Sequence, residues 1–249
     1  MVSDFMLGLL PRAEELLKEL GLEDFEFFVM RHAAVLDITV GAGHEYRQTV
    51  YGAHAPGVRL SPVGTEQARE FKYYWANNLD CPDVVVCSEL HRARDTAEIS
   101  IMDNFLVLPP TLILSSALVD NLLGTKWLDI PRRDWTKRRL KYWQEQLNSE
   151  GLHSQPENPY QTQNRVVREV LRYLVEYRNS KIVFVSHGDP ICFLFQYLLE
   201  EEIMNLVEYH SIRAVDKCTL WKVCRQNGTT MVELLFKPSI ESFAYPPVK

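Results

Sequence analysis

Several classes of protein are excluded by what this sequence of 249 residues lacks. It has no apolar run approaching the roughly 18 residues that a membrane-spanning helix needs. The first ten residues lack the basic segment and the long apolar stretch of a secretory signal peptide. Basic residues are not in excess, since 27 Lys and Arg stand against 33 Asp and Glu, whereas nucleic-acid-binding domains usually carry a basic excess. We therefore expect a protein that binds neither a membrane nor nucleic acid.

The cysteines do not form the pattern of a disulfide scaffold or of a metal site. There are five, an odd number, and no two of them have the CxxC spacing that is typical of zinc sites and redox motifs. Together with the missing export signal, this favours reduced thiols and a cytoplasmic location.

Common catalytic and nucleotide-binding motifs are also absent. The sequence contains no GxGxxG, no GxxxxGK[ST] and no HExxH, so it lacks the dinucleotide fingerprint, the phosphate-binding P-loop and the zinc-protease motif. A cysteine phosphatase needs a CxxxxxR loop. Cys87 is followed by Arg92 after four intervening residues and by Arg94 after six. Neither arginine has the five intervening residues that the loop requires.

The sequence does contain the patterns of an ordinary globular protein, with 46% hydrophobic and 24% charged residues. Apolar runs of strand length predict strands at residues 25–30, 83–87, 112–114 and 181–185. Helical patterns lie between them, at residues 11–20, 61–76, 90–104, 131–147 and 163–178. Near the end of the chain, Asn227-Gly228 separates residues 219–224 from residues 230–236 and predicts a β-hairpin.

The alternation of strands and helices predicts an α/β protein, a three-layer αβα sandwich around a mostly parallel mixed sheet. We expect a single domain over residues 1–249, with helix 11–20 before the first strand and a small inserted cap at about 126–160. The basic residues of the cap, within 132–141, form either a solvated helix face or a surface that attracts an acidic or multiply phosphorylated substrate.

Cationic and titratable side chains follow three of the predicted strands. Arg31 and His32 follow the first strand, Arg92 follows the second, and His187 follows the strand at residues 181–185. Because the carboxyl ends of parallel strands form the ligand-binding edge of an open α/β sheet, we expect these four side chains to converge. Two arginines and two histidines make an anion site, and guanidinium geometry suits phosphate.

Four segments occur in order along the chain and correspond to one set of family signatures. They read RHA at residues 31–33, LSPVGTEQA at residues 60–68, SELHRARDTA at residues 88–97 and SHG at residues 186–188. In turn they match R-H-G, L-[ST]-x-x-G-x-x-Q-A, S-x-L-x-R-A-x-x-T-A and S-H-G. With these matches the chain resembles the histidine phosphatase superfamily, in its phosphoglycerate-mutase-like branch.

This resemblance implies a covalent phosphoenzyme and neither a metal ion nor another cofactor. His32 attacks phosphorus as a neutral imidazole. Arg31, Arg92 and His187 bind the phosphoryl oxygens and neutralise their charge. A nucleophilic histidine needs a free lone pair, whereas its partner is more useful when protonated.

The general acid is left open among three carboxyl groups. The branch carries a glutamate in a segment L-x-E-x-x-x-G, and residues 118–124 have the same frame with Asp120 in its place. Asp189 is a rival because it follows His187-Gly188, and in the acid-phosphatase branch the acid is an aspartate immediately after the second histidine. Glu98, on the helix after Arg92, is the third candidate. We expect Asp120.

The resulting expectation is a metal-independent phosphatase that hydrolyses a phosphorylated small molecule or a phosphopeptide. An alternative is a catalytically weak member that binds a phosphorylated ligand or serves as a scaffold. A phosphomutase is disfavoured, because residues 33–37 after His32 are largely apolar, where mutases carry a polar run. The sequence specifies neither the substrate nor the oligomeric state.

Overall fold

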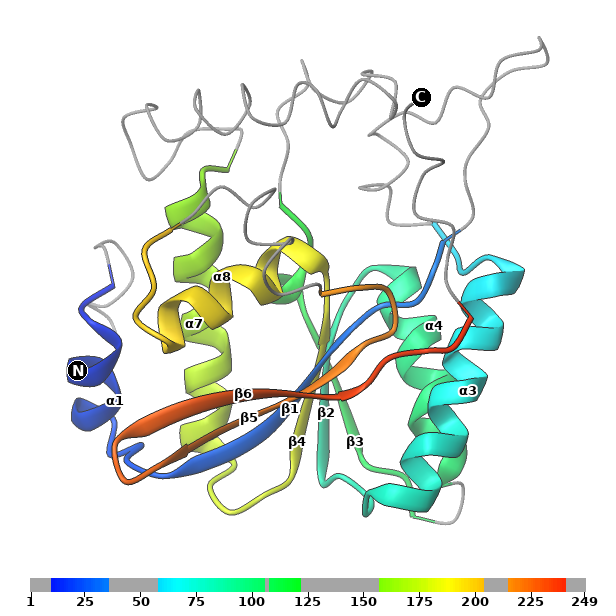
Figure 1. Cartoon of the computed structure of the whole chain (residues 1–249), viewed down its shortest axis with the longest axis horizontal. Helices are drawn as coiled ribbons and strands as arrows, with labels where there is room; N and C mark the ends of the chain where they lie inside the picture. The colour runs from blue at the N-terminus through cyan, green and yellow to red at the C-terminus, as the bar shows by residue number, and fades with distance from the viewer. Residues whose placement is uncertain (1–9, 36–57, 106–107, 122–156, 204–214, 241–249) are drawn as a thin grey trace, which may run out of the picture.

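One mixed sheet of six strands lies at the centre of the computed structural model (Figure 1), which describes residues 10–35, 58–105, 108–121, 157–203 and 215–240. The order across the sheet is β3-β2-β4-β1-β5-β6. The strands are β1 (Phe25–Arg31), β2 (Val84–Ser88), β3 (Thr111–Ser115), β4 (Ile182–Ser186), β5 (Leu220–Gln226) and β6 (Thr229–Phe236). All the predicted strands are confirmed, with bounds within one or two residues.

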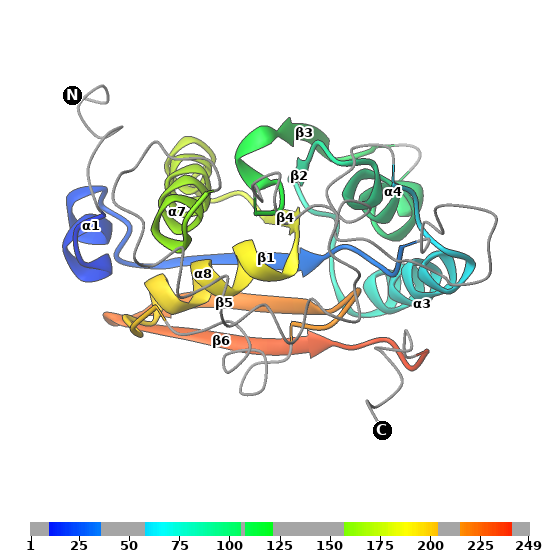
Figure 2. The same cartoon turned by 90° about the horizontal axis from the view of Figure 1, so that it is seen from above.

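Strand direction decides which chain segments meet at one edge. Strands β1, β2, β3 and β4 run parallel to one another, so their carboxyl ends lie at the same edge. Strand β5 is antiparallel to β1, with Leu220 paired to Met30, and Figure 2 shows β1, β5 and β6 side by side. The amino end of β5 therefore lies beside the carboxyl end of β1.

Helices cover both faces of the sheet. Helices α1 (Ala13–Glu19), α7 (Pro159–Glu176) and α8 (Gly188–Leu198) pack on one face, and α3 (Pro62–Asn78) and α4 (His91–Ser100) pack on the other (Figure 1). Alternate residues of β1 serve the two cores, since Phe27 packs with the first group and Phe28 with the second. The predicted three-layer α/β architecture is confirmed. Two short 3₁₀ helices, η2 (Met102–Asn104) and η3 (Ser116–Leu118), complete the described elements.

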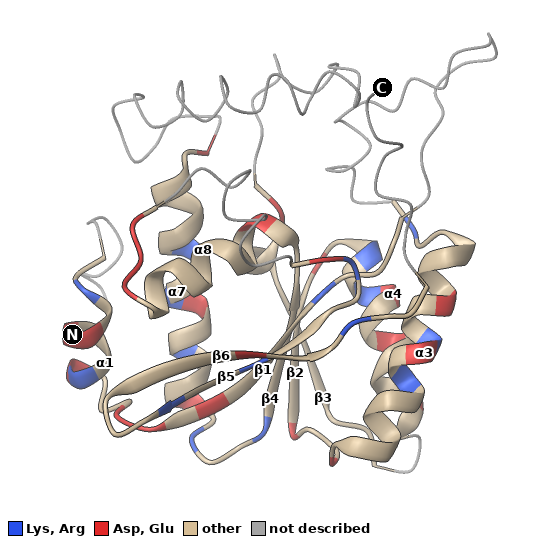
Figure 3. Ribbon diagram, in the orientation of Figure 1, with Lys and Arg blue, Asp and Glu red and all other residues tan. Residues whose placement is uncertain are grey.

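The two central strands are buried along their whole length. Every residue of β2 and of β4 is buried, and neither strand carries a charged residue, as Figure 3 shows. Strands covered by helices on both faces have no solvent side, which explains their continuous apolar runs.

Two helices differ in length from the sequence prediction. Helix α7 begins at Pro159 and not at residue 163, because Asn158 and Gln161 form a capping box and proline occupies the first turn. Helix α4 ends at Ser100 and not at residue 104. The hydroxyl of Ser100 donates to the carbonyl of Thr96, four residues earlier, a bond that weakens and bends helices.

Helix α8 was not predicted from the sequence. All of its residues except Asp189 are buried, so it shows no alternation between an apolar and a polar face. A helix without that period cannot be recognised from amphipathic spacing.

The hairpin between β5 and β6 was predicted correctly. Asn227 and Gly228 have φ of 52° and 76°, and two positive φ values are what a two-residue hairpin turn requires. The predicted helix at 131–147 and most of the expected cap lie outside the described residues. The remaining part, residues 157–160, leads into and begins α7.

The described residues also bear on two expectations from composition, those on membrane-spanning helices and on disulfide bonds. Within the described ranges, no helix has the length and apolarity needed to cross a bilayer. All five cysteines are free thiols.

The segment at residues 60–68 holds the loop that follows His32. The side-chain oxygen of Gln67 accepts a hydrogen bond from Ala34 N at 2.9 Å, and Ser61 N donates to Ala34 O at 3.0 Å. Gly64 lies in the first turn of α3, where a Cβ atom would stand 1.9 Å from Ala34 O. Helix α3 therefore approaches this loop so closely that only glycine fits.

We expect the substitution Gly64→Ala to destabilise the fold by about 1–3 kcal/mol, because its methyl group meets backbone that cannot move without losing the bonds to Ser61 and Gln67. Urea unfolding measures the change. Val63→Ala, at a more exposed position one residue earlier, is the control and should be nearly neutral. Equal stability of the two variants would contradict the close approach.

Candidate active site

The carboxyl edge of the parallel strands brings together the four side chains that the sequence placed there. Arg31 ends β1, His32 follows it, Arg92 lies in the first turn of α4, and His187 immediately precedes α8. The exposed fractions of His32, Arg92 and His187 are only 2%, 1% and 0%. The two imidazole rings lie with their centroids 5.0 Å apart. The predicted convergence is confirmed as a matter of geometry.

The hydrogen bonds of His32 determine its tautomer. Nδ1 lies 2.7 Å from the carbonyl oxygen of Ala33, and a carbonyl only accepts, so Nδ1 carries the proton. Nε2 then has a lone pair, and the ammonium of Lys217 donates to it at 3.0 Å. Burial, followed by the charges of Lys217 and Arg92, lowers the pKa of His32 well below its usual range. His32 is therefore neutral near pH 7.

The backbone around His32 is held by three elements. His32 N donates to Ser186 O of β4 at 3.0 Å, and Ala33 N donates to the hydroxyl of Thr96 on α4 at 3.0 Å. Cys218 N, in the segment before β5, donates to His32 O at 3.3 Å. The imidazole is thus carried by a backbone with little freedom to shift.

Both arginines present buried N–H groups without an acceptor among the described residues. Arg31 donates from Nη1 to Val215 O at 2.5 Å, but its Nε has no partner there. Arg92 approaches Asp120 with Nη2, at 3.4 Å, while its Nη1 has no partner there. Burial lowers the pKa of both groups, although arginine remains protonated in proteins. Buried donors of this kind call for an anionic acceptor.

His187 lies between a hydroxyl and a carboxylate. Its Nε2 is 2.9 Å from Ser88 Oγ, and its Nδ1 is 3.7 Å from Asp120 Oδ2. The same carboxylate oxygen faces Arg92. Asp120 therefore stands at the cluster, with its side chain about 20% exposed.

The two rival carboxylates are placed differently from Asp120. Asp189 lies in the first turn of α8 and accepts a hydrogen bond from the side chain of Asn121 at 2.9 Å. Glu98 lies on α4, with its side chain 50% exposed and paired with Arg94. The structure thus brings Asp120 against Arg92 and His187, and leaves Glu98 on the helix surface.

Two side chains of the cluster were missed by the sequence analysis. Ser88 lies inside the matched segment at residues 88–97 but had been given no role of its own, and it contacts His187. Lys217 belongs to no motif and is far from the other site residues in sequence, yet it contacts the ring of His32.

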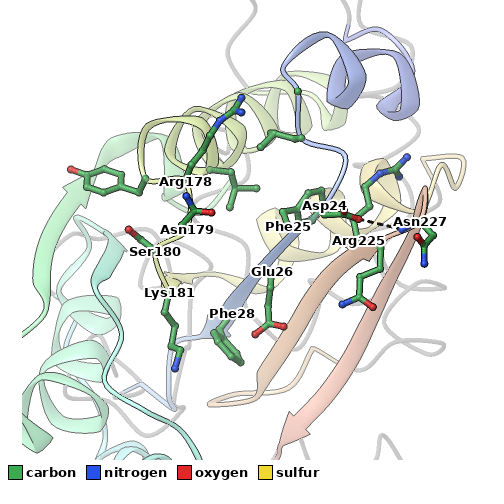
Figure 4. Close-up of a pocket in the computed structure, with 15 residues that line it drawn as sticks. Asp24, Phe25, Glu26, Phe28, Arg178, Asn179, Ser180, Lys181, Arg225 and Asn227 are labelled. Atoms are coloured by element: carbon green, nitrogen blue, oxygen red, sulfur yellow. Dashed lines mark hydrogen bonds between the residues drawn. The ribbon is translucent and has the colours of Figure 1, made fainter.

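A second polar site lies at the opposite edge of the sheet (Figure 4) and differs in its electrostatics. This pocket of about 740 Å³ is lined by residues at the start of β1 and the end of β5. Its cations already have partners, since Arg225 pairs with Glu14 at 2.5 Å and Lys181 with Asp80 at 2.8 Å. Arg225 Nε is also a buried donor without an acceptor among the described residues, but the carboxylates of Asp24 and Glu26 line the same pocket. The carboxyl edge combines two such guanidinium groups with two histidines, so it is the better candidate for an anion.

Comparison with known families agrees with this geometry. The family model described as "Histidine phosphatase superfamily (branch 1)" matches residues 27–237. The chain therefore belongs to the histidine phosphatase superfamily. Within it, the match is to branch 1, and it spans every residue of the cluster around His32 and His187. No curated protein sequence matches this chain.

Several solved structures of similar fold carry the name of a phosphatase. A mutant phosphoserine phosphatase from Entamoeba histolytica, in complex with phosphoserine, has a TM-score of 0.61 at 20% identity, covering 83% of this chain and 94% of that one. The alpha-ribazole phosphatase from Shigella flexneri has a TM-score of 0.60 at 22% identity, covering 87% and 98%. The mycobacterial glucosyl-3-phosphoglycerate phosphatase has a TM-score of 0.58 at 18% identity, covering 85% and 97%. At these identities the likeness is one of fold.

Gly188 lies in close contact with the guanidinium of Arg31. A Cβ atom at this position would stand 2.9 Å from Arg31 Cζ. The Arg31 side chain is flexible, so we expect Gly188→Ala to displace the guanidinium while the fold stays intact. Losing one charge-assisted hydrogen bond weakens anion binding by about tenfold or more.

Calorimetric titration with orthophosphate measures this loss, and thermal unfolding verifies the fold. Arg31→Met is the matched comparison and should weaken phosphate binding at least as much. Wild-type phosphate affinity in Gly188→Ala would show that Arg31 does not depend on this close approach.

Proposed function

We propose that this protein is a phosphatase that hydrolyses a phosphomonoester through a phosphohistidine intermediate at His32. One observation carries the proposal. A neutral imidazole with its lone pair on Nε2 lies beside two arginines whose buried N–H groups lack acceptors. Membership of the histidine phosphatase superfamily supports the same reaction class.

In the first step, His32 Nε2 attacks phosphorus. The Nε2–P bond forms as the bond between phosphorus and the ester oxygen breaks, and the leaving group departs as an alcohol after taking up a proton. Arg31, Arg92 and a protonated His187 would neutralise the charge of the transferring phosphoryl group. Their fixed positions reduce the reorganisation that this step requires.

Asp120 is the general acid that we favour. It would give its proton to the leaving oxygen in the first step. As a carboxylate it would then take a proton from the water that attacks phosphorus, which releases phosphate and restores neutral His32. Its position within 4 Å of both Arg92 and His187 supports this role over that of Asp189.

The substrate that we propose is a phosphorylated small molecule or a phosphopeptide. The cations described above supply the charge that phosphoryl transfer needs, so the proposed reaction requires no metal ion. Five free cysteines fit the reducing environment of the cytoplasm, where we propose that the protein acts.

The phosphohistidine is tested with a phosphomonoester that carries labelled phosphate, in the presence of excess chelator. We expect the wild-type protein to form an acid-labile, base-stable phosphoenzyme, and His32→Ala to lose both this species and turnover. His91→Ala, outside the cluster, is the control. Labelling or full turnover in His32→Ala would overturn the mechanism. If the wild-type protein shows neither labelling nor turnover, it is a phosphate-binding protein without this activity.

The acid is tested by comparing Asp120→Asn with Asp189→Asn. For an alkyl phosphate, whose leaving group needs a proton, we expect Asp120→Asn to lower kcat by about 10²–10⁴. With p-nitrophenyl phosphate the first step needs no acid, so this variant should release a burst of nitrophenolate before slow turnover. The opposite ranking of the two variants would assign the acid to Asp189.

A further inference from the structure

We propose that Lys217 is a further catalytic residue, whose ammonium occupies the lone pair of His32 Nε2 in the substrate-free protein and moves to a phosphoryl oxygen when substrate binds. The inference rests on the proposed phosphatase function. It adds a residue that neither the sequence motifs nor the family signatures contain.

The starting state follows from hydrogen-bond chemistry. An ammonium has three donors and no acceptor, so at 3.0 Å Lys217 Nζ donates to His32 Nε2. The other ring nitrogen is committed to the carbonyl of Ala33. The lone pair needed for attack is therefore engaged by Lys217, and no bond from Nε2 to phosphorus can form until that ammonium moves.

The arriving phosphoryl group supplies a better acceptor close by. In a reactive complex phosphorus stands about 3–3.5 Å from the attacking atom, so its non-bridging oxygens lie within reach of a small shift of the Lys217 side chain. A bond from an ammonium to an anionic oxygen is stronger than one to a neutral nitrogen. The same N–H donor thus exchanges one acceptor for another, and the lone pair becomes free.

The fold fixes the backbone on either side of Lys217. Cys218 N donates to His32 O at 3.3 Å, and Arg31 Nη1 donates to Val215 O at 2.5 Å. The exchange can therefore take place through rotation of a flexible side chain, without movement of the chain. This segment leads into β5, whose antiparallel direction places it at the carboxyl edge of β1.

The electrostatics agree with this position. After burial, the charge of Lys217 is the largest influence that lowers the pKa of His32. The ammonium therefore helps to keep the nucleophile unprotonated before substrate arrives, and it adds positive charge where phosphate would bind.

The test compares Lys217→Met, which removes the charge, with Lys217→Arg, which keeps it. Lys222→Met is the control, because Lys222 lies on β5 and pairs with Glu26 at 2.7 Å. Three quantities are measured: orthophosphate affinity by calorimetry, the rate at which diethyl pyrocarbonate acylates His32, and kcat/KM for p-nitrophenyl phosphate. Thermal unfolding verifies that each variant is folded.

We expect Lys217→Met to move two of these readouts in opposite directions. Orthophosphate affinity should fall by about tenfold or more, because a charge-assisted hydrogen bond is lost. Acylation of His32 should become several-fold faster, because the neutral reagent then meets an unoccupied lone pair. The value of kcat/KM should fall by at least as much as phosphate affinity. Lys217→Arg should retain phosphate affinity, and Lys222→Met should resemble the wild type.

The contrary results are distinct. Unchanged phosphate affinity in folded Lys217→Met would overturn the inference, and so would unchanged acylation. If Lys217→Met does not fold, Lys217→Arg decides, because it keeps the positive charge. Loss of phosphate affinity in folded Lys217→Arg would then overturn the inference. If the wild type hydrolyses no phosphomonoester, the proposed function fails, while phosphate affinity and acylation still decide whether Lys217 makes these contacts.

Discussion

Buried positive charge at the carboxyl edge of the sheet is the constraint on which the site depends. The guanidinium groups of Arg31 and Arg92 are held there with N–H donors that lack acceptors among the described residues, and a buried donor left unsatisfied costs about 1–3 kcal/mol. Two hydrophobic cores, one on each face of the sheet, provide the stability that offsets this cost. Such a site is ready for an anion because its donors need not be reorganised to receive one.

Residues from several of the matched segments meet at the loop after His32. Gln67 and Thr96 each bind a backbone N–H of this loop, and Ser186 accepts from His32 itself. These residues come from three separate segments of the sequence, and they fix one short stretch of chain. Much of the family signature is therefore concerned with holding the imidazole in place, and only a few of its residues face the anion.

Sequence reasoning succeeded where a physical rule links pattern to position, and failed where none applies. The buried strands β2 and β4 are visible as apolar runs, and the rule that ligands bind at strand carboxyl ends placed Arg92 and His187 together. Helix α8 has no polar face to reveal its period. Lys217 precedes β5, and it lies at the site only because β5 is antiparallel to β1. The sequence pattern of β5 does not reveal this direction, so it could not place the Lys217 side chain.

The carbonyl of Ala33 also has a stereochemical consequence. Because it holds the proton on Nδ1 of His32, only the nitrogen remote from the main chain is available to accept a group. Any phosphoryl group taken up by this ring is thereby confined to the tele isomer of phosphohistidine, with phosphate on Nε2. In the proposed reaction, a backbone carbonyl bonded to the other ring nitrogen would thus select which of the two phosphohistidine isomers forms.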